Sequence, residues 1–155
     1  MLKLSILEFF LISIPESLIF IMGIYFLSER FFTKKRLIIM ALLFAIESYC
    51  VRMLPIQFGI HLAINIIFSI ILSVNIGEIS MEDAISYNMI MTIILCISEF
   101  ISIFVLTKVF QINVPLLRLT PITKVIYFIP YFILFVFNVF LINKFMDRRK
   151  QCKNI

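Results

Sequence analysis

Three carboxylates lie well inside long apolar stretches of this 155-residue chain, away from the ends of those stretches, namely Glu16, Glu47 and Glu99. Placing a charged side chain in hydrocarbon costs about 2.5 to 3.5 kcal/mol on insertion scales, so such a residue needs a partner or a function. His61, the one histidine of the chain, lies in another apolar stretch. Carboxyl and imidazole groups in such surroundings can exchange protons or bind a ligand.

Helical spacing brings these residues onto faces with other polar side chains. At about 100° per residue, His61 and Asn65 share one helix face, and Tyr127 and Tyr131 share another. Glu99 falls within an arc of about 80° together with three further polar residues, Asn88, Thr92 and Ser102. We therefore predict a ligand-binding surface in the outer half of a helical bundle, formed by Glu47, His61, Asn65, Glu99, Tyr127 and Tyr131.

Glu16 is expected near the middle of its helix, where it would act as a switch that responds to protonation or ligand binding. Pro15 precedes it and leaves a backbone carbonyl one turn earlier without its donor. The alternative for each of these residues is packing alone, because polar side chains commonly join helices in lipid at roughly 0.6 kcal/mol per hydrogen bond. We predict no catalytic residue, no metal site and no cofactor.

Arg52 follows Glu47 by five residues, which is about 140° around a helix, so the two are not expected to pair on one face. The favoured interpretation is that Arg52 extends toward the headgroups and anchors the outer end of its helix.

Five apolar stretches must position these side chains. They cover residues 5–27, 37–54, 57–76, 86–109 and 121–146, and 63% of the chain is hydrophobic with a mean hydropathy of +1.12. Since about 20 apolar residues cross a bilayer, we predict an all-α membrane bundle of five crossings as a single domain over 1–155. A short basic tail, 147–155, is expected after the last crossing. The second and third stretches could instead form one re-entrant element.

Lys and Arg residues predict the orientation of this bundle. Nine lie on the side of the first connector and the tail: Arg30, Lys34, Lys35, Arg36, Lys144, Arg148, Arg149, Lys150 and Lys153. Five lie on the other side: Lys3, Arg52, Lys108, Arg118 and Lys124. The excess places the amino terminus outside and the carboxyl terminus in the cytoplasm of a bacterial cell membrane. The net charge of +5 is accordingly attributed to orientation and anionic lipid, not to nucleic acid.

Two membrane peptidase patterns are incomplete here. The first pattern needs a His and a Cys two turns apart on one helix. Here Phe68 stands at the position after His61 where the Cys would be, so the thiol is missing. The glutamate-dependent intramembrane proteases carry paired glutamates, whereas Ser48 follows Glu47 and only one histidine exists. An intramembrane protease is therefore a remote alternative, and we predict that the protein is not an enzyme.

The stretch LEFFLISIPESLIFIMGIYFL, with FFTKKRLIIM and VRMLPIQFGIH after it, resembles the amino-terminal membrane sensor region of clostridial histidine kinases. These are the accessory-gene-regulator-like kinases with a GHKL-type ATPase module. The resemblance spans about residues 7–76 and implies a membrane receptor part that reads an extracellular cue, often a peptide. It carries over no functional residue, and the chain ends at Ile155 without a kinase module.

We therefore expect a non-enzymatic sensor or regulatory subunit that works with a separate signalling protein such as a histidine kinase, alone or as an oligomer in the bilayer. A small transporter subunit or solute-binding membrane component is the competing expectation. Five helices without an internal repeat make a secondary transporter the weaker of the two.

Overall fold

Five α-helices and one short π-helix form the part of the chain that the computed structural model describes, residues 9–28, 33–54, 58–108 and 121–153. They are, in chain order, η1 (Phe9–Ser13), α2 (Ile14–Ser28), α3 (Lys34–Met53), α4 (Phe58–Asn75), α5 (Met81–Lys108) and α6 (Pro121–Lys153). The predicted all-helical class is confirmed for these residues.

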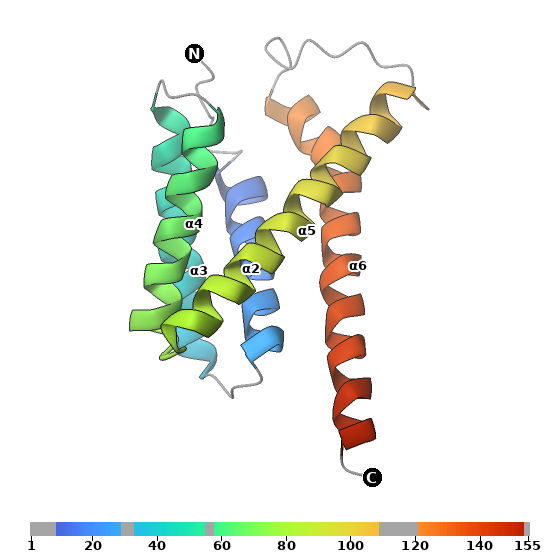
Figure 1. Cartoon of the computed structure of the whole chain (residues 1–155). Helices are drawn as coiled ribbons and strands as arrows, with labels where there is room; N and C mark the ends of the chain where they lie inside the picture. Colours follow the sequence, from blue (N-terminus) through green and yellow to red (C-terminus); the bar gives the residue numbers. More distant parts are fainter. Residues whose placement is uncertain (1–8, 29–32, 55–57, 109–120, 154–155) are drawn as a thin grey trace.

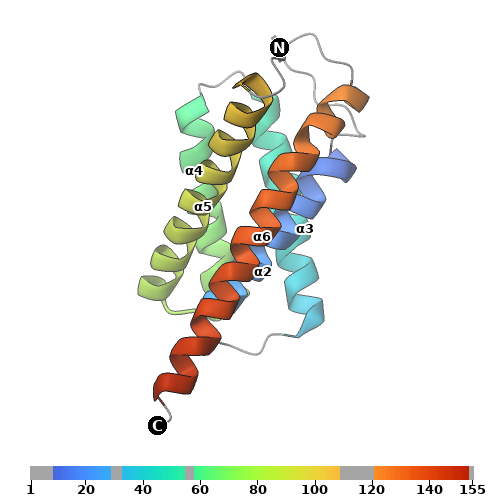
Figure 2. The ribbon, with the colours of Figure 1, turned by 90° about the vertical axis from the view of Figure 1, so that its right-hand side faces the viewer.

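The bundle is built around α2, which contacts α3, α5 and α6. Helix α4 packs on α3, while α5 crosses the bundle at a slant and contacts α2, α4 and α6 (Figure 1). Seen from the side, α6 continues past the other helices at its carboxyl end (Figure 2). It therefore includes residues 147–153, which the sequence had predicted as a separate tail. Lys and Arg are good helix formers, so the change to basic residues does not end the helix.

The first helix begins differently from its prediction. Residues 9–13 adopt a π-helix before α2 starts at Ile14, whereas the sequence predicted one regular helix over 5–27. Pro15 cannot donate the hydrogen bond that an α-helix requires at this point, and its ring crowds the preceding turn. A wider π turn is a common way for a helix to accommodate such a break.

The ends of the other helices follow local chemistry. Ser80 caps α5, since the Asp83 N–H donates to Ser80 Oγ at 3.4 Å and Ser80 Oγ donates to Asp83 Oδ2 at 2.6 Å. This cap starts α5 at Met81, earlier than the predicted segment 86–109. At the end of α3, Leu54 is extended, as expected for a residue before proline.

Two connections lie at the same end of the bundle. The end of α2 and the start of α3 lie near the turn between α4 and α5 (Figure 1). There Arg36 pairs with Glu78 at 2.9 Å. Glu78 has a φ of 53°, a left-handed conformation that turns the chain between α4 and α5.

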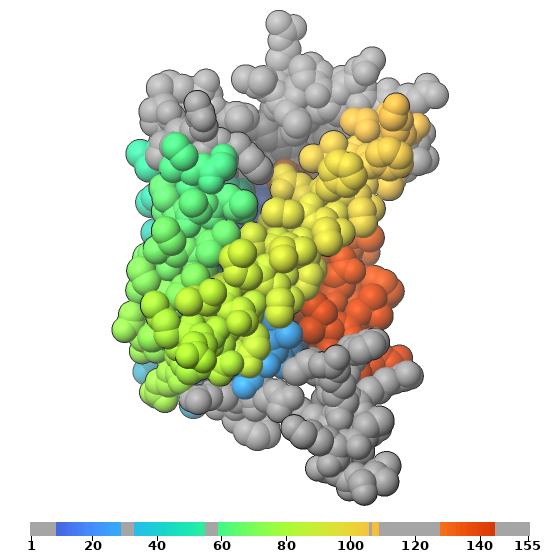
Figure 3. Space-filling view, viewed as in Figure 1, coloured from blue at the N-terminus to red at the C-terminus, as the bar shows by residue number. Residues whose placement is uncertain are grey.

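The bundle buries many polar side chains and exposes many apolar ones. Ser69, Ser73, Asn88 and Ser98 are fully buried, and Ser69 Oγ donates to Asn88 Oδ1 between α4 and α5. Asn138 of α6 donates to Ser98 Oγ of α5 at 2.9 Å. The outer face of α5 is apolar at helical spacing, through Ile85, Met89, Ile93, Ile97, Phe100 and Phe104, all exposed. In Figure 3, α5 lies across the front of the molecule.

Two helical stretches, Phe9–Ser28 and Met81–Val105, are long and apolar enough to cross a membrane. The stretches Gly59–Asn75 and Phe128–Lys144 are apolar but shorter. The apolar core lies mainly between α2 and α3, where Phe20 and Phe44 stack with centroids 5.1 Å apart.

Gly23 permits the close approach of α2 and α5. A Cβ atom at this position would overlap Cε and Sδ of Met91, whose side chain is fully buried. Gly59, by contrast, has no such neighbour within 4 Å among the described atoms.

We predict that Gly23→Ala is less stable than Gly59→Ala by about 1 to 3 kcal/mol in denaturant unfolding of the purified protein in micelles, because the added methyl group overpacks the α2 and α5 interface. In a Met91→Ala background the difference should shrink, since the clashing thioether is gone. Equal unfolding free energies for the two glycine variants would show that α2 and α5 do not pack this closely.

Candidate functional site

A buried carboxylate joins three helices. Glu16 of α2 is 8% exposed, and its Oε1 accepts a hydrogen bond from the Tyr131 hydroxyl of α6 at 2.8 Å. Its Oε2 accepts from Arg52 Nη2 of α3 at 3.3 Å, which also makes an ion pair. We call Glu16, Arg52 and Tyr131 the polar clasp.

Each proline-interrupted helix contributes one residue to the clasp directly after its proline. Pro15 precedes Glu16, and Pro130, inside α6, precedes Tyr131. A proline within a helix removes one backbone hydrogen bond and favours a bend there. The Glu16 to Tyr131 hydrogen bond therefore connects α2 and α6 at the level where each helix contains a proline.

Aromatic neighbours fix the phenol ring of Tyr131, which is 4% exposed. The ring stacks on Phe135 with centroids 6.0 Å apart and meets Phe128 edge-on at 5.5 Å. These contacts hold the hydroxyl toward α2, so the acceptor on Glu16 meets a donor that is already oriented.

The prediction for Arg52 was wrong. Its guanidinium turns inward to Glu16, and its side chain is only 32% exposed, whereas the sequence favoured an arginine extended toward the headgroups. A buried carboxylate lowers its own desolvation cost by pairing with a guanidinium, and α3 packs on α2 closely enough for this pair to form.

Glu16 was also expected to lie at a different depth from the other polar residues, but it contacts Tyr131 and Arg52 directly. Its carboxylate therefore lies within hydrogen-bond distance of Tyr131, a residue of the predicted surface.

Two further carboxylates surround the clasp. Glu99 of α5 interacts electrostatically with both Glu16 and Arg52. Glu47 of α3 interacts electrostatically with Arg52 as well, although the two residues do not share a helix face. Within the described part of the chain, this centre thus combines three carboxyl groups with one guanidinium.

Asn65 and His61 of α4 form the other side of this centre. With its nitrogen turned toward its two acceptors, the Asn65 amide donates to Glu47 Oε1 at 3.2 Å and to the His61 backbone carbonyl at 3.2 Å. Glu47 Oε2 is buried and has no hydrogen-bond partner among the described residues. Glu47 thereby links the α3 and α4 interface to Arg52 and the clasp.

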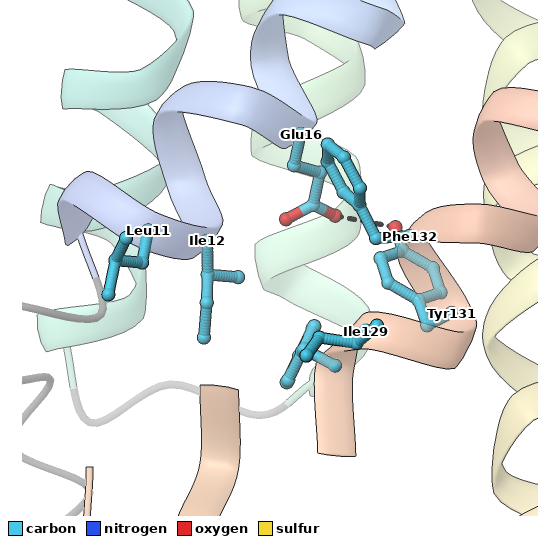
Figure 4. Close-up of a pocket in the computed structure, with 7 residues that line it drawn as sticks. Leu11, Ile12, Glu16, Ile129, Tyr131 and Phe132 are labelled. Carbon is cyan, nitrogen blue, oxygen red and sulfur yellow. Dashed lines mark hydrogen bonds between the residues drawn. The ribbon is translucent and has the colours of Figure 1, made fainter. Parts of the chain in front are cut away.

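A cavity of about 110 Å³ opens beside Glu16 and Tyr131, between η1 and α6. Leu11 and Ile12 contribute one wall, and Ile129 and Phe132 lie across from them (Figure 4). Phe128 of α6 also lines the cavity. The Glu16 carboxylate and the Tyr131 hydroxyl meet at the edge of this space, so a molecule in the cavity would contact the clasp directly.

The structure thus brings together most of the residues singled out from the sequence. Glu16, Glu99 and Tyr131 gather with Arg52, while Glu47, Asn65 and His61 lie between α3 and α4. The side chain of Tyr127 lies outside the described residues. Among those that are described, no group of three or more His, Cys, Asp or Glu side chains is arranged to hold a metal ion.

The geometry offers a place for proton exchange or for a charged ligand. Comparison with models of protein families, with curated proteins and with solved structures finds no match to this chain.

We predict that Arg52→Gln lowers the free energy of unfolding in micelles by about 2 kcal/mol, between the values typical of exposed and buried ion pairs. The partly buried Glu16 would lose its ionic partner. Arg36→Gln is the matched control, because Arg36 and Glu78 are 45% and 62% exposed and their pair should be worth less than about 1 kcal/mol.

A Glu16→Gln, Arg52→Gln double variant should lose less than the sum of the two single losses. Strict additivity would show that the Glu16 and Arg52 side chains do not interact in the folded protein.

Proposed function

We propose that this chain is a five-crossing membrane bundle that acts as a non-enzymatic sensor or regulatory subunit for an extracellular cue. The observation that carries the proposal is the polar clasp. One buried carboxylate holds α2, α3 and α6 together beside a cavity, at the level where two of these helices are interrupted by proline.

The distribution of side chains supports a membrane location. Fully buried Ser and Asn side chains hydrogen-bond inside the bundle, while large apolar side chains cover the outside of α3, α5 and α6. Helices in lipid associate through small and polar residues, because lipid provides no hydrophobic force between them. The same exterior would be unfavourable in water.

The arrangement of the helix ends supports the proposed orientation. The end of α2, the start of α3, the α4 to α5 turn and the end of α6 lie toward one end of the bundle (Figure 1). This end carries the excess of Lys and Arg and would face the cytoplasm of a bacterial cell membrane. The polar clasp and the cavity would then lie toward the outside, within reach of an external cue.

A sensor needs an element with two arrangements that a ligand can bias. The clasp provides one, because protonation of Glu16 or occupation of the cavity would weaken its contacts with Arg52 and Tyr131. The segments of α2 and α6 around Pro15 and Pro130 would then shift. Helix α6 continues to Lys153 and would carry this shift to a cytoplasmic partner.

The partner that we propose is a signalling protein such as a histidine kinase. The resemblance of residues 7–76 to the membrane region of clostridial kinases supports this choice. A small transporter subunit is the second candidate, and the cavity beside Glu16 favours it, since a solute could occupy the same space.

Crosslinking and capture from native membranes, with a tag at the carboxyl end and mass spectrometry, separates these candidates. We predict capture of a histidine kinase, with a yield that changes about fivefold or more in Glu16→Gln, as expected for coupling between two sites. Glu78→Gln is the matched control, because it removes an exposed carboxylate that is ion-paired at the other end of the bundle.

Capture of an ATPase or another transport subunit in place of a kinase would support the transporter. A kinase yield that is equal in wild type and Glu16→Gln would contradict the clasp as the sensing element.

A further inference from the structure

We propose that the cavity beside Glu16 binds a small methylated ammonium ion, with its methyl groups against the apolar walls and its positive charge beside the Glu16 carboxylate. This inference deepens the proposed function and rests on it, because it names the chemical class of the cue. It follows from the shape of the cavity, its walls and the charges around it.

The walls of the cavity favour an occupant with an apolar surface. Leu11, Ile12 and Ile129 are aliphatic, and Phe128 and Phe132 are aromatic. Water is poorly held in a space of this kind, since each buried water typically needs two to four polar partners. The volume of about 110 Å³ corresponds to about four water molecules at roughly 30 Å³ each, so the occupant is small.

The charges select a cation. The Glu16 carboxylate is the charged group among the residues that line the cavity, and the Arg52 guanidinium that pairs with its Oε2 is not one of them. An anion in the cavity would lie against this carboxylate and be repelled. A cation would instead be attracted to it, and the rings of Phe128 and Phe132 would add favourable cation–π contacts.

The hydrogen bonds that Glu16 already accepts favour an occupant whose nitrogen is methylated. Both carboxylate oxygens of Glu16 already have donors, from Tyr131 and Arg52. A primary ammonium has three N–H groups that need acceptors, and six of the seven lining residues offer no carboxylate. A quaternary ammonium has no N–H group to satisfy, so it gains from charge and apolar contact, and its positive charge would compete with Arg52 for the Glu16 carboxylate.

The position of the occupant connects binding to the proposed signal. It would lie between η1, which precedes Pro15, and the turn of α6 that precedes Pro130 (Figure 4). A bound ion would hold these two segments at a fixed separation.

The test uses the full-length chain in nanodiscs with tetramethylammonium chloride as the probe and sodium chloride at the same ionic strength as the salt control. Binding is measured by isothermal titration calorimetry. We expect saturable binding that weakens at least tenfold in Glu16→Gln, and weak or no binding of the neutral probe tert-butanol.

A cavity-filling variant guards against misfolding of Glu16→Gln. Ile129→Trp should abolish binding, because the indole occupies the space while Glu16, Arg52 and Tyr131 remain. Ile133→Trp is the matched control, since Ile133 is exposed one turn later on α6 and does not line the cavity. It should bind like the wild type.

Several outcomes would overturn the inference: no saturable binding to the wild type, equal binding of tert-butanol, or full binding by both Glu16→Gln and Ile129→Trp. The proposed function can fail separately. Kinase capture that depends on Glu16 without tetramethylammonium binding would remove only the ligand class, whereas binding without any effect on capture would remove only the signalling role.

Discussion

The cost of burying one carboxylate constrains how α2, α3 and α6 pack in this bundle. Glu16 is almost fully buried among apolar helices, so its charge must be compensated within the protein. Arg52 provides the charge and Tyr131 provides a hydrogen bond, and these partners come from two other helices. The positions of α3 and α6 relative to α2 are thereby linked to a single side chain.

The other contacts between helices include hydrogen bonds between neutral side chains. Ser69 and Asn88 join α4 to α5, and Ser98 and Asn138 join α5 to α6, so the helices that do not contribute to the clasp are held by neutral hydrogen bonds. Neutral hydrogen bonds of this kind do not depend on charge or on a ligand. The contacts of the polar clasp do depend on the charge of Glu16, so the clasp is the element through which a cue could act.

Much of the fold follows from the sequence, because apolar stretches separated by charge and proline determine where helices can form. The Ser80 cap and the extended Leu54 were predictable, since each depends on neighbouring residues alone. The inward face of α5 also followed, because helical spacing places Asn88 with Thr92 and both side chains are buried.

Contacts between helices could not be predicted in this way. Arg52 was assigned to the bundle surface because its own helix offers it no acid on the same face, and its partner Glu16 lies 36 residues away on α2. The sequence shows that a proline precedes both Glu16 and Tyr131. Only the fold shows that these two side chains contact each other.

Pulsed electron paramagnetic resonance in nanodiscs tests the clasp most directly. Spin labels at Phe10→Cys of η1 and Ile133→Cys of α6, both exposed positions, would report the distance across it after replacement of the native cysteines. The account predicts one narrow distance distribution in the wild type and a broader or longer one in Glu16→Gln. Labels at Met22→Cys of α2 and Leu141→Cys of α6 should also report a change, because α6 is proposed to carry the shift toward its carboxyl end. Identical distributions across the clasp in wild type and Glu16→Gln would contradict the claim that Glu16 holds these helices together.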